Sequence, residues 1–197
     1  MAADVVVVPT GVANLASVLA GFRRVGAVPE VALDAEAVLD APRVMLPGVG
    51  AFGPAMEGLR AKALDTALRE RIAAGRRTMA ICVGLQLLFE ASDESPGASG
   101  LGVIAGEVGR FPAGVRAPQF GWNEVRPAPD CRLLEPGYAY FANSYRALQA
   151  PGCAVAWAEH GGRFVAAVER GSLLACQFHP ELSGAYGRQL LERWLEG

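Results

Sequence analysis

The sequence predicts an α/β fold, in which helices pack on a mainly parallel sheet, as a single domain of residues 1–197. Apolar runs alternate with helical patterns through the first half of the chain, as in strand–helix–strand units. The first run, residues 5–8, is four valines, which fits a strand buried on both faces of a parallel sheet. The chain has 197 residues, 52% of them hydrophobic, so it can bury one substantial core.

The first half of the chain contains four predicted strand and helix pairs. Apolar residues at helical spacing between Asn14 and Val25 predict a helix that Gly26 ends. The elements that follow are a strand at 28–33, a short helix at 34–40, a strand at 43–46, a helix at 54–74, a strand at 78–81 and a helix at 83–90.

The second half changes character, because short strand-like runs are separated by glycine, proline and polar turns. This pattern predicts an antiparallel extension of the same sheet. The expected strands are 103–111, 121–125, 138–141, 153–158, 164–169 and 173–177. A closing helix should begin near Ser183, with Tyr186, Leu190, Leu191, Trp194 and Leu195 on one face.

Composition narrows the class of function. The formal net charge is −2 and no run of Lys or Arg stands out, so nucleic acid and anionic membranes are unexpected partners. No apolar stretch approaches the ~18 residues of a membrane span, and the N-terminus lacks the basic region of an export signal. The four cysteines (Cys82, Cys131, Cys153, Cys176) form no CxxC pair and have no histidine at metal-ligand spacing. We therefore expect no metal, no cofactor, no disulfide scaffold and a cytoplasmic location.

Cys82 stands where a predicted buried strand turns into a helix, between the small residues Ala80 and Gly84. Such a turn can aim a nucleophile into a cleft at the carboxyl end of the sheet, and it needs small neighbours because backbone passes close by. The positive end of the following helix favours the reactive thiolate. A cysteine that only packs in the core is commoner, so this context alone leaves both interpretations open.

A nucleophilic cysteine needs a base, and the chain has two histidines. His160 lies among polar residues at 159–163, which are typical of a surface turn. His179 follows an apolar run and precedes Pro180, so it should end a strand. Glu181, two residues further on, can orient its imidazole. A plain turn explains His-Pro-Glu about as well by itself, but Cys82, His179 and Glu181 together favour catalysis.

Pro47-Gly48-Val49-Gly50 ends another predicted parallel strand. The backbone N–H groups of Val49 and Gly50 are candidates for an oxyanion hole facing the same cleft. Without the cysteine, a tight strand-to-helix turn would explain these glycines equally well.

Five segments together resemble the class I (triad-type) glutamine amidotransferases, and within them the HisH-type subunit of imidazole glycerol phosphate synthase. They occur in that family's order over most of the chain. The segments are Leu46-Pro-Gly-Val-Gly-Ala-Phe52, Ile81-Cys-Val-Gly-Leu-Gln-Leu-Leu88, Gly121-Trp-Asn123, Tyr140-Phe141 with Ser144-Tyr145, and Gln177-Phe-His-Pro-Glu181.

The resemblance implies a flavodoxin-like three-layer fold and a glutaminase. Cys82 would attack the side-chain amide of glutamine, His179 would carry the proton to the leaving ammonia, and Glu181 would orient His179. Gly50 would belong to the oxyanion strand. Four positions would line the glutamine pocket: Gln86, Glu94, Ser144 and Tyr145. For Glu94, a solvated carboxylate in the loop at 92–100 is an equally good interpretation.

The family's partner is a HisF-type (β/α)8-barrel cyclase, with which the subunit forms a heterodimer. The cyclase uses the ammonia to convert PRFAR to imidazole glycerol phosphate and AICAR in histidine biosynthesis. The resemblance implies the same partner here, and we expect Asn14, Trp122 and Asn123 to lie at the interface. For Trp122, packing in the core is an equal alternative.

The chain departs from the family pattern at three places. Pro9-Thr-Gly-Val-Ala-Asn-Leu15 lacks the usual Asp and, at Ala13, one glycine. Leu182 replaces the usual lysine after His-Pro-Glu, which removes an expected ion pair with the partner. Ala80 replaces the more common glycine. The first two departures put docking and signalling in question, and none touches the three proposed catalytic residues.

Three other interpretations remain. The glutaminase subunit of pyridoxal phosphate synthase carries a Gly-Gly-Glu-Ser type motif where this chain has PGVGAF. A catalytically silent regulatory module would not need Cys82, His179 and Glu181. A cysteine peptidase on a similar scaffold would not explain Gln86 or the Gly-Trp-Asn segment.

Overall fold

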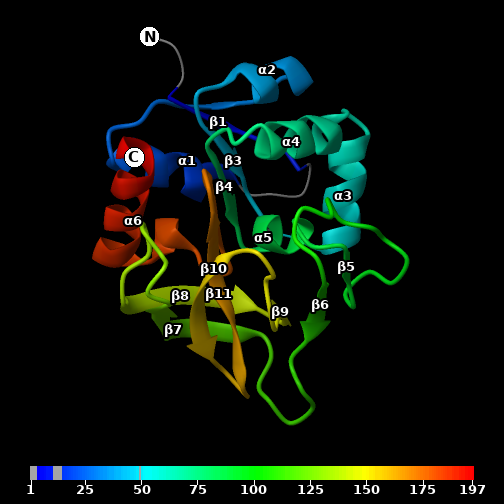
Figure 1. Cartoon of the computed structure of the whole chain (residues 1–197), viewed down its shortest axis with the longest axis vertical. Coiled ribbons are helices and arrows are strands. Elements are labelled where there is room, and N and C mark those ends of the chain that lie inside the picture. The colour runs from blue at the N-terminus through cyan, green and yellow to red at the C-terminus, as the bar shows by residue number, and fades with distance from the viewer. Residues whose placement is uncertain (1–3, 11–14, 49) are drawn as a thin grey trace.

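A nine-stranded sheet runs through the computed structural model, which describes residues 4–10, 15–48 and 50–197 (Figure 1). Its first five strands pair in parallel, in the order β2 (Pro29–Val31), β1 (Val5–Val7), β3 (Val44–Leu46), β4 (Thr78–Ile81) and β12 (Leu173–Cys176). Four antiparallel strands follow: β11 (Arg163–Arg170), β10 (Ala154–Glu159), β7 (Gln119–Pro127) and β8 (Gly137–Asn143). The predicted α/β class, with a parallel sheet and an antiparallel extension, is confirmed.

One strand was assigned to the wrong part of this sheet. The run at 173–177 was expected in the antiparallel extension, but β12 lies parallel to β4, with Ala175 opposite Ala80 and Cys176 opposite Ile81. All four residues of β12 are buried, as are all four of β4. A continuous apolar run fits the doubly covered centre of a parallel sheet better than an exposed margin. The residues that follow the two strands therefore share one edge of the sheet.

A second, three-stranded sheet was not expected. It has the order β5 (Ala91–Ser92), β6 (Glu107–Arg110) and β9 (Tyr145–Ala147). Only its middle strand falls within the run predicted at 103–111, and that strand does not join the main sheet. The short sheet ties the segment after Cys82 to the segment that contains Tyr145.

Helices cover both faces of the parallel strands, which gives three layers (Figure 1). On one face lie α1 (Leu15–Arg24) and α6 (Gly184–Glu196), which touch through the rings of Phe22 and Trp194 at 5.8 Å. On the other lie α3 (Phe52–Arg60), α4 (Leu64–Ala73) and the short α5 (Val83–Leu87). The helix α2 (Ala35–Asp40) packs on α4, and a 3-10 turn, η1 (Pro180–Leu182), leads from β12 to α6.

Two predicted helices are wrong in extent. The expected helix at 54–74 is two helices, because Ala63 takes a left-handed backbone (φ 54°) between them. The expected helix at 83–90 ends at Leu87, after which the Glu90 N–H bonds to the Gly106 carbonyl. Neither break has a proline or glycine at its position, so local sequence gave no signal for it.

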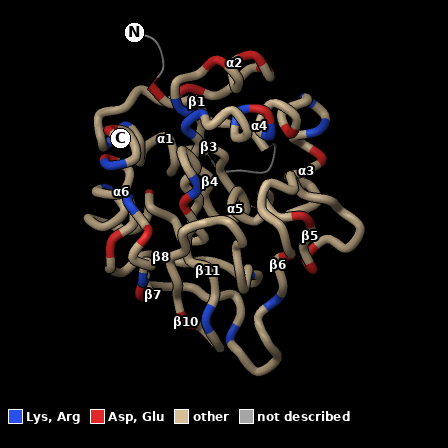
Figure 2. The backbone as a smooth tube through the Cα atoms, viewed as in Figure 1, with Lys and Arg blue, Asp and Glu red and all other residues tan. Residues whose placement is uncertain are grey.

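Positively and negatively charged residues are interspersed over the molecule, including along α4 and α6 (Figure 2). One charge is fully buried: the Arg71 side chain of α4 is 0% exposed. Its guanidinium donates to the main-chain carbonyls of Val38, Ala41 and Arg77, and burial lowers its pKa to about 10. This side chain therefore fastens α2 and the start of β4 to α4.

Candidate active site

Cys82 directly follows β4 and precedes α5, as the sequence predicted. Its backbone has φ 54° and ψ −111°, which is strained for a residue with a side chain and costs of the order of 1–3 kcal/mol. The surrounding fold holds it there, since the Cys82 N–H donates to the Cys176 carbonyl at 2.7 Å. The sharp turn after a buried strand is the geometry of a nucleophile elbow.

Two glycines make room for this turn. A Cβ at Gly84 would lie 2.3 Å from the Leu46 carbonyl oxygen, and a Cβ at Gly48 would lie 2.1 Å from the Gly84 nitrogen. The turns after β3 and β4 are thus in backbone-to-backbone contact, which only residues without a side chain allow.

His179 lies three residues beyond the end of the neighbouring strand β12, just before η1, and its imidazole is buried. Its Nδ1 and Glu181 Oε1 are 2.8 Å apart, and its side chain also hydrogen-bonds Cys82. Main-chain contacts fix its position, because the His179 N–H donates to Tyr140 and its carbonyl accepts from the Ser183 hydroxyl. The structure therefore brings Cys82, His179 and Glu181 together at the carboxyl ends of β4 and β12.

The environment of His179 favours its protonated form. Burial disfavours the cation, but the hydrogen bonds with Cys82 and Glu181 and their negative charges outweigh burial and raise the pKa of His179 to about 10. A protonated His179 beside the sulfur can stabilise negative charge that develops there. The other histidine, His160, lies at the β10–β11 turn, as expected, with Nε2 2.7 Å from the Arg116 carbonyl oxygen.

The oxyanion candidates are only partly described. Val49 lies outside the described residues, and Gly50 is exposed with φ 103°. The neighbouring Gly48 carbonyl accepts from the Val83 N–H at 3.4 Å. Sequence reasoning missed Val83, although the residue after the nucleophile commonly supplies one oxyanion donor in such an elbow.

Two of the four predicted pocket residues contact each other. The Gln86 side chain is buried and donates from Nε2 to the Tyr145 carbonyl, at 3.2 Å, and to Gln177 Oε1, at 3.0 Å. Gln177 in turn places Nε2 3.6 Å from Cys82 Sγ. Gln177 belongs to a motif recognised in the sequence, but no role was predicted for it there.

Glu94 and Ser144 have different surroundings. Glu94 Oε2 accepts from the Phe52 N–H at 2.8 Å, at the first residue of α3. The loop at 92–100 is thereby attached next to the glycine-rich turn after β3. Ser144 is half-buried, and its carbonyl accepts from the Phe111 N–H at 3.1 Å.

Of the predicted interface residues, Asn14 lies outside the described residues. Trp122 is 57% exposed on β7, so the alternative that it packs in the core is wrong. Asn123 uses its amide within the chain, donating to the Glu159 carbonyl at 2.9 Å. Beside Trp122, Phe120 and Tyr138 are 68% and 60% exposed on the same face of the β7–β8 pair. We call Phe120, Trp122 and Tyr138 the aromatic patch.

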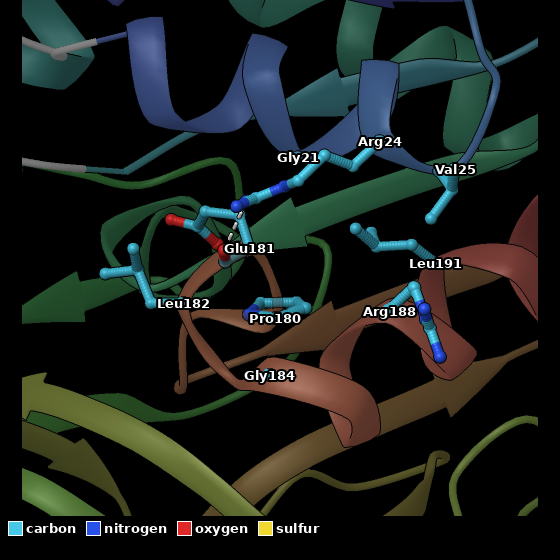
Figure 3. A pocket seen from close by; sticks show the side chains of 9 residues that line it. All are labelled: Gly21, Arg24, Val25, Pro180, Glu181, Leu182, Gly184, Arg188 and Leu191. Atoms are coloured by element: carbon cyan, nitrogen blue, oxygen red, sulfur yellow. Dashed lines mark hydrogen bonds between the residues drawn. The ribbon is translucent and has the colours of Figure 1, made fainter.

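A cavity of about 370 Å³ lies between α1, η1 and α6 (Figure 3). Glu181 lines it, together with Gly21, Arg24 and Leu191, whereas Cys82 and His179 do not. Arg24 Nη2 donates to the Glu181 carbonyl at 2.8 Å, so α1 holds the main chain of this residue (Figure 3). The cavity therefore lies on the α1 and α6 side of Glu181 and is distinct from the space around the Cys82 sulfur.

Within the part of the chain that the structure describes, no three His, Cys, Asp or Glu side chains are grouped closely enough to hold a metal ion. No helix within 4–10, 15–48 and 50–197 is long and apolar enough to cross a membrane.

Comparison with known proteins places the chain in a family. The family profile "Glutamine amidotransferase class-I" matches residues 25–196, and the chain belongs to that family. Two solved structures share the fold: a glutamine amidotransferase (TM-score 0.78, 21% identity, covering 97% of each chain) and PurLQS from Thermotoga maritima (TM-score 0.74, 17% identity, covering 97% of this chain and 96% of that one).

Within that class, curated relatives identify a narrower group. The chain is 42% identical to the imidazole glycerol phosphate synthase subunit HisH of Symbiobacterium thermophilum, over 98% of this chain and 93% of that protein. It is 43% identical to the HisH subunit of Mycolicibacterium paratuberculosis, over 98% and 97%. The chain is therefore a member of the HisH family.

The contact between the two turns predicts that Gly84→Ala is strongly destabilising. The new methyl group would overlap the Leu46 carbonyl, and we expect a loss of roughly 3 kcal/mol in the free energy of unfolding, measured by urea titration. Gly109→Ala is the matched control, since its Cβ would be 3.4 Å from the nearest atom, on Asp93. Equal effects of the two substitutions would contradict the close packing.

The raised pKa of His179 predicts a pH-dependent contribution to stability. A folded-state pKa of about 10, above the ordinary 6.5, means that protonated His179 stabilises the fold fully below pH 6.5, and that this stabilisation is lost as pH rises through 10. The difference in unfolding free energy between the unmodified protein and His179→Asn should therefore shrink from about pH 6 to about pH 10. His160→Asn controls for loss of a histidine elsewhere. A difference that stays constant over this range would contradict the assignment.

Proposed function

We propose that this chain hydrolyses L-glutamine to glutamate and ammonia, with Cys82 as nucleophile, His179 as proton carrier and Glu181 as the group that orients His179. One observation carries the proposal: these three buried side chains meet at the carboxyl ends of two adjacent parallel strands. The 2.8 Å contact between Glu181 and Nδ1 of His179 leaves Nε2 to face the sulfur.

The reaction begins when the Cys82 thiolate attacks the side-chain amide carbon of glutamine. A C–S bond forms, and the carbonyl π electrons move onto the oxygen. When this intermediate collapses, the C–N bond breaks, and the His179 imidazolium gives its proton to the leaving nitrogen, which departs as ammonia. His179 then takes a proton from water, whose oxygen attacks the thioester. The C–S bond then breaks, the new carboxyl group releases its proton to solvent as glutamate leaves, and the Cys82 thiolate and the His179 imidazolium are restored.

The oxyanion needs donors from the two glycine-rich turns. The Val83 N–H is one candidate, and the N–H groups of Val49 and Gly50 are the others. Val83 is bonded to the Gly48 carbonyl at the long distance of 3.4 Å, so a small movement of Gly48 would free this donor for substrate. A conformational requirement of this kind fits a glutaminase that is slow until its partner is bound.

We propose that Gln86, Glu94, Ser144 and Tyr145 line the glutamine pocket. One oxygen of Glu94 is bonded to Phe52, and the other would accept from the ammonium of the substrate. Gln86 differs from the other three, because both of its amide hydrogen bonds go to groups of the chain.

We further propose a heterodimer with a HisF-type (β/α)8-barrel cyclase, which uses the ammonia to convert PRFAR to imidazole glycerol phosphate and AICAR in histidine biosynthesis. The support is the name of the relatives, which are subunits of imidazole glycerol phosphate synthase. The aromatic patch is a suitable docking surface, because exposed Trp and Tyr side chains are typical of interfaces. Leu182, 46% exposed on η1, would add an apolar contact where the family has a lysine.

The test is glutamine hydrolysis by the purified chain, alone and with the cyclase plus its nucleotide ligand. We expect slow hydrolysis alone and a rise of about 5–150-fold with the loaded partner. Cys82→Ala should abolish both rates, Cys153→Ala should change neither, and Trp122→Ala should lose the stimulation while keeping the basal rate.

Two outcomes would contradict the proposal, and each rejects a different part of it. Hydrolysis without stimulation would reject the cyclase as partner and leave the glutaminase. No hydrolysis, and no labelling of Cys82 by a glutamine-mimicking electrophile with the partner present, would favour a silent regulatory module.

A further inference from the structure

We propose that Gln177 and Gln86 form a two-residue relay that presents an amide N–H to the sulfur of Cys82 and stabilises its thiolate. Gln177 would act as a catalytic residue, because it touches the reacting atom. Gln86 would act as a positioning residue through Gln177. The inference rests on the proposed function, in which Cys82 is the nucleophile.

The relay is buried and has short connections. Gln177, 0% exposed, follows β12 directly, and its main chain is held by an N–H bond of 2.8 Å to the Ala166 carbonyl. Its Nε2 is 3.6 Å from Cys82 Sγ, and its Oε1 is 3.0 Å from Gln86 Nε2. Gln86, 3% exposed, lies on α5 one turn after Cys82. The relay thus runs from the Gln86 amide on α5 to the Gln177 amide after β12, and from there to the Cys82 sulfur.

A main-chain carbonyl fixes the direction of the relay. The Tyr145 carbonyl can only accept a hydrogen bond, so the Gln86 atom that faces it at 3.2 Å must be the amide nitrogen. The second hydrogen of that nitrogen goes to Gln177, whose facing atom must then be the amide oxygen. Gln177 is left with its nitrogen toward the sulfur. The donor on Cys82 therefore follows from the connectivity of the hydrogen bonds.

This donor favours one protonation state of Cys82. A hydrogen bond to the charged form of a group stabilises that form, and such bonds are stronger than neutral ones. The sulfur faces Gln177 as well as His179, so two donors share the negative charge. Cys176 gives a contrast within the same strand pair: burial, with the charges of Glu169 and Glu181, raises its pKa well above the ordinary value.

The relay adds a role to the one predicted for Gln86, because it uses only the amide nitrogen of that side chain. Loss of a substrate contact mainly raises KM, whereas loss of the relay mainly lowers kcat, because less thiolate is present. Steady-state kinetics of Gln86→Met with the partner present therefore report the two roles separately.

The decisive experiment measures alkylation of Cys82 by iodoacetamide against pH in the full-length chain, read by mass spectrometry of the Cys82 peptide. The variants are Gln177→Met and Gln86→Met, which keep the side-chain length without the amide. Gln119→Met is the matched control, because Gln119 is also a buried glutamine, 6% exposed, but lies on β7. Urea titration checks that each variant folds.

We expect Gln177→Met to react about tenfold more slowly near pH 6, since the thiolate loses a hydrogen bond to its charged form. Its profile should move to higher pH and, where the thiol is fully ionised, match or exceed the unmodified rate, because a less stabilised thiolate is more nucleophilic. General structural damage would instead lower the rate at every pH. Gln86→Met should show a smaller shift, and Gln119→Met none.

A double variant tests whether the two residues act in series. Gln86→Met combined with Gln177→Met should be no slower than Gln177→Met alone. Additive effects, or profiles of both single variants that coincide with the unmodified protein, would overturn the relay. Should Gln177→Met not fold, Gln86→Met tests the same shift without touching the sulfur. If the unmodified chain hydrolyses glutamine while these tests fail, only the relay is wrong, whereas absence of hydrolysis would reject the proposed function itself.

Discussion

In the centre of the sheet, β12 lies parallel to β4, and every feature of the candidate site depends on this pairing. It places the Cys176 carbonyl where it accepts from the Cys82 N–H, which holds the strained backbone of that cysteine. It also puts the residues after β12 beside the sulfur, so that His179 and Gln177 reach it from one short segment. Two strands far apart in the chain thus supply a reactive atom and its surroundings at one edge of the sheet.

Most polar groups around this edge are hydrogen-bonded to one another in an apolar interior. Glu181 bonds the imidazole through one carboxylate oxygen and is itself held by Arg24 through its carbonyl, while its second carboxylate oxygen is buried without a partner among the described residues. On the opposite side, the Gln86 nitrogen bonds one carbonyl and the Gln177 oxygen, and the Gln177 nitrogen bonds the sulfur. Because unpaired polar groups are costly at low dielectric, such a set tolerates few alternative arrangements. The fold therefore restricts the orientation and protonation of the site before any substrate is present.

The sequence was sufficient for features that local pattern determines. The strand at 78–81, the elbow at Cys82 and the strand end at His179 follow from apolar runs bounded by small residues or proline. The sequence was insufficient where contacts between residues far apart in the chain determine the structure. The parallel placement of β12 depends on pairing with a strand about 95 positions away in the sequence, and the break at Ala63 has no local signal. The relay was missed for the same reason, since only the folded chain shows that Gln177 and Gln86 satisfy each other.

Buried Arg71 limits how the amino-acid sequence around α2 can vary within this family. Its guanidinium bonds to the main-chain carbonyls of residues 38, 39, 41, 42 and 77, which every amino acid carries, and to one side chain, the hydroxyl of Thr78. The charge therefore constrains the path of the backbone at 38–42 and leaves the identity of the side chains there free. Substitutions can accumulate around α2 without loss of the anchor, provided that the arginine is retained. Position 71 should consequently be far less variable among relatives than the segment it holds.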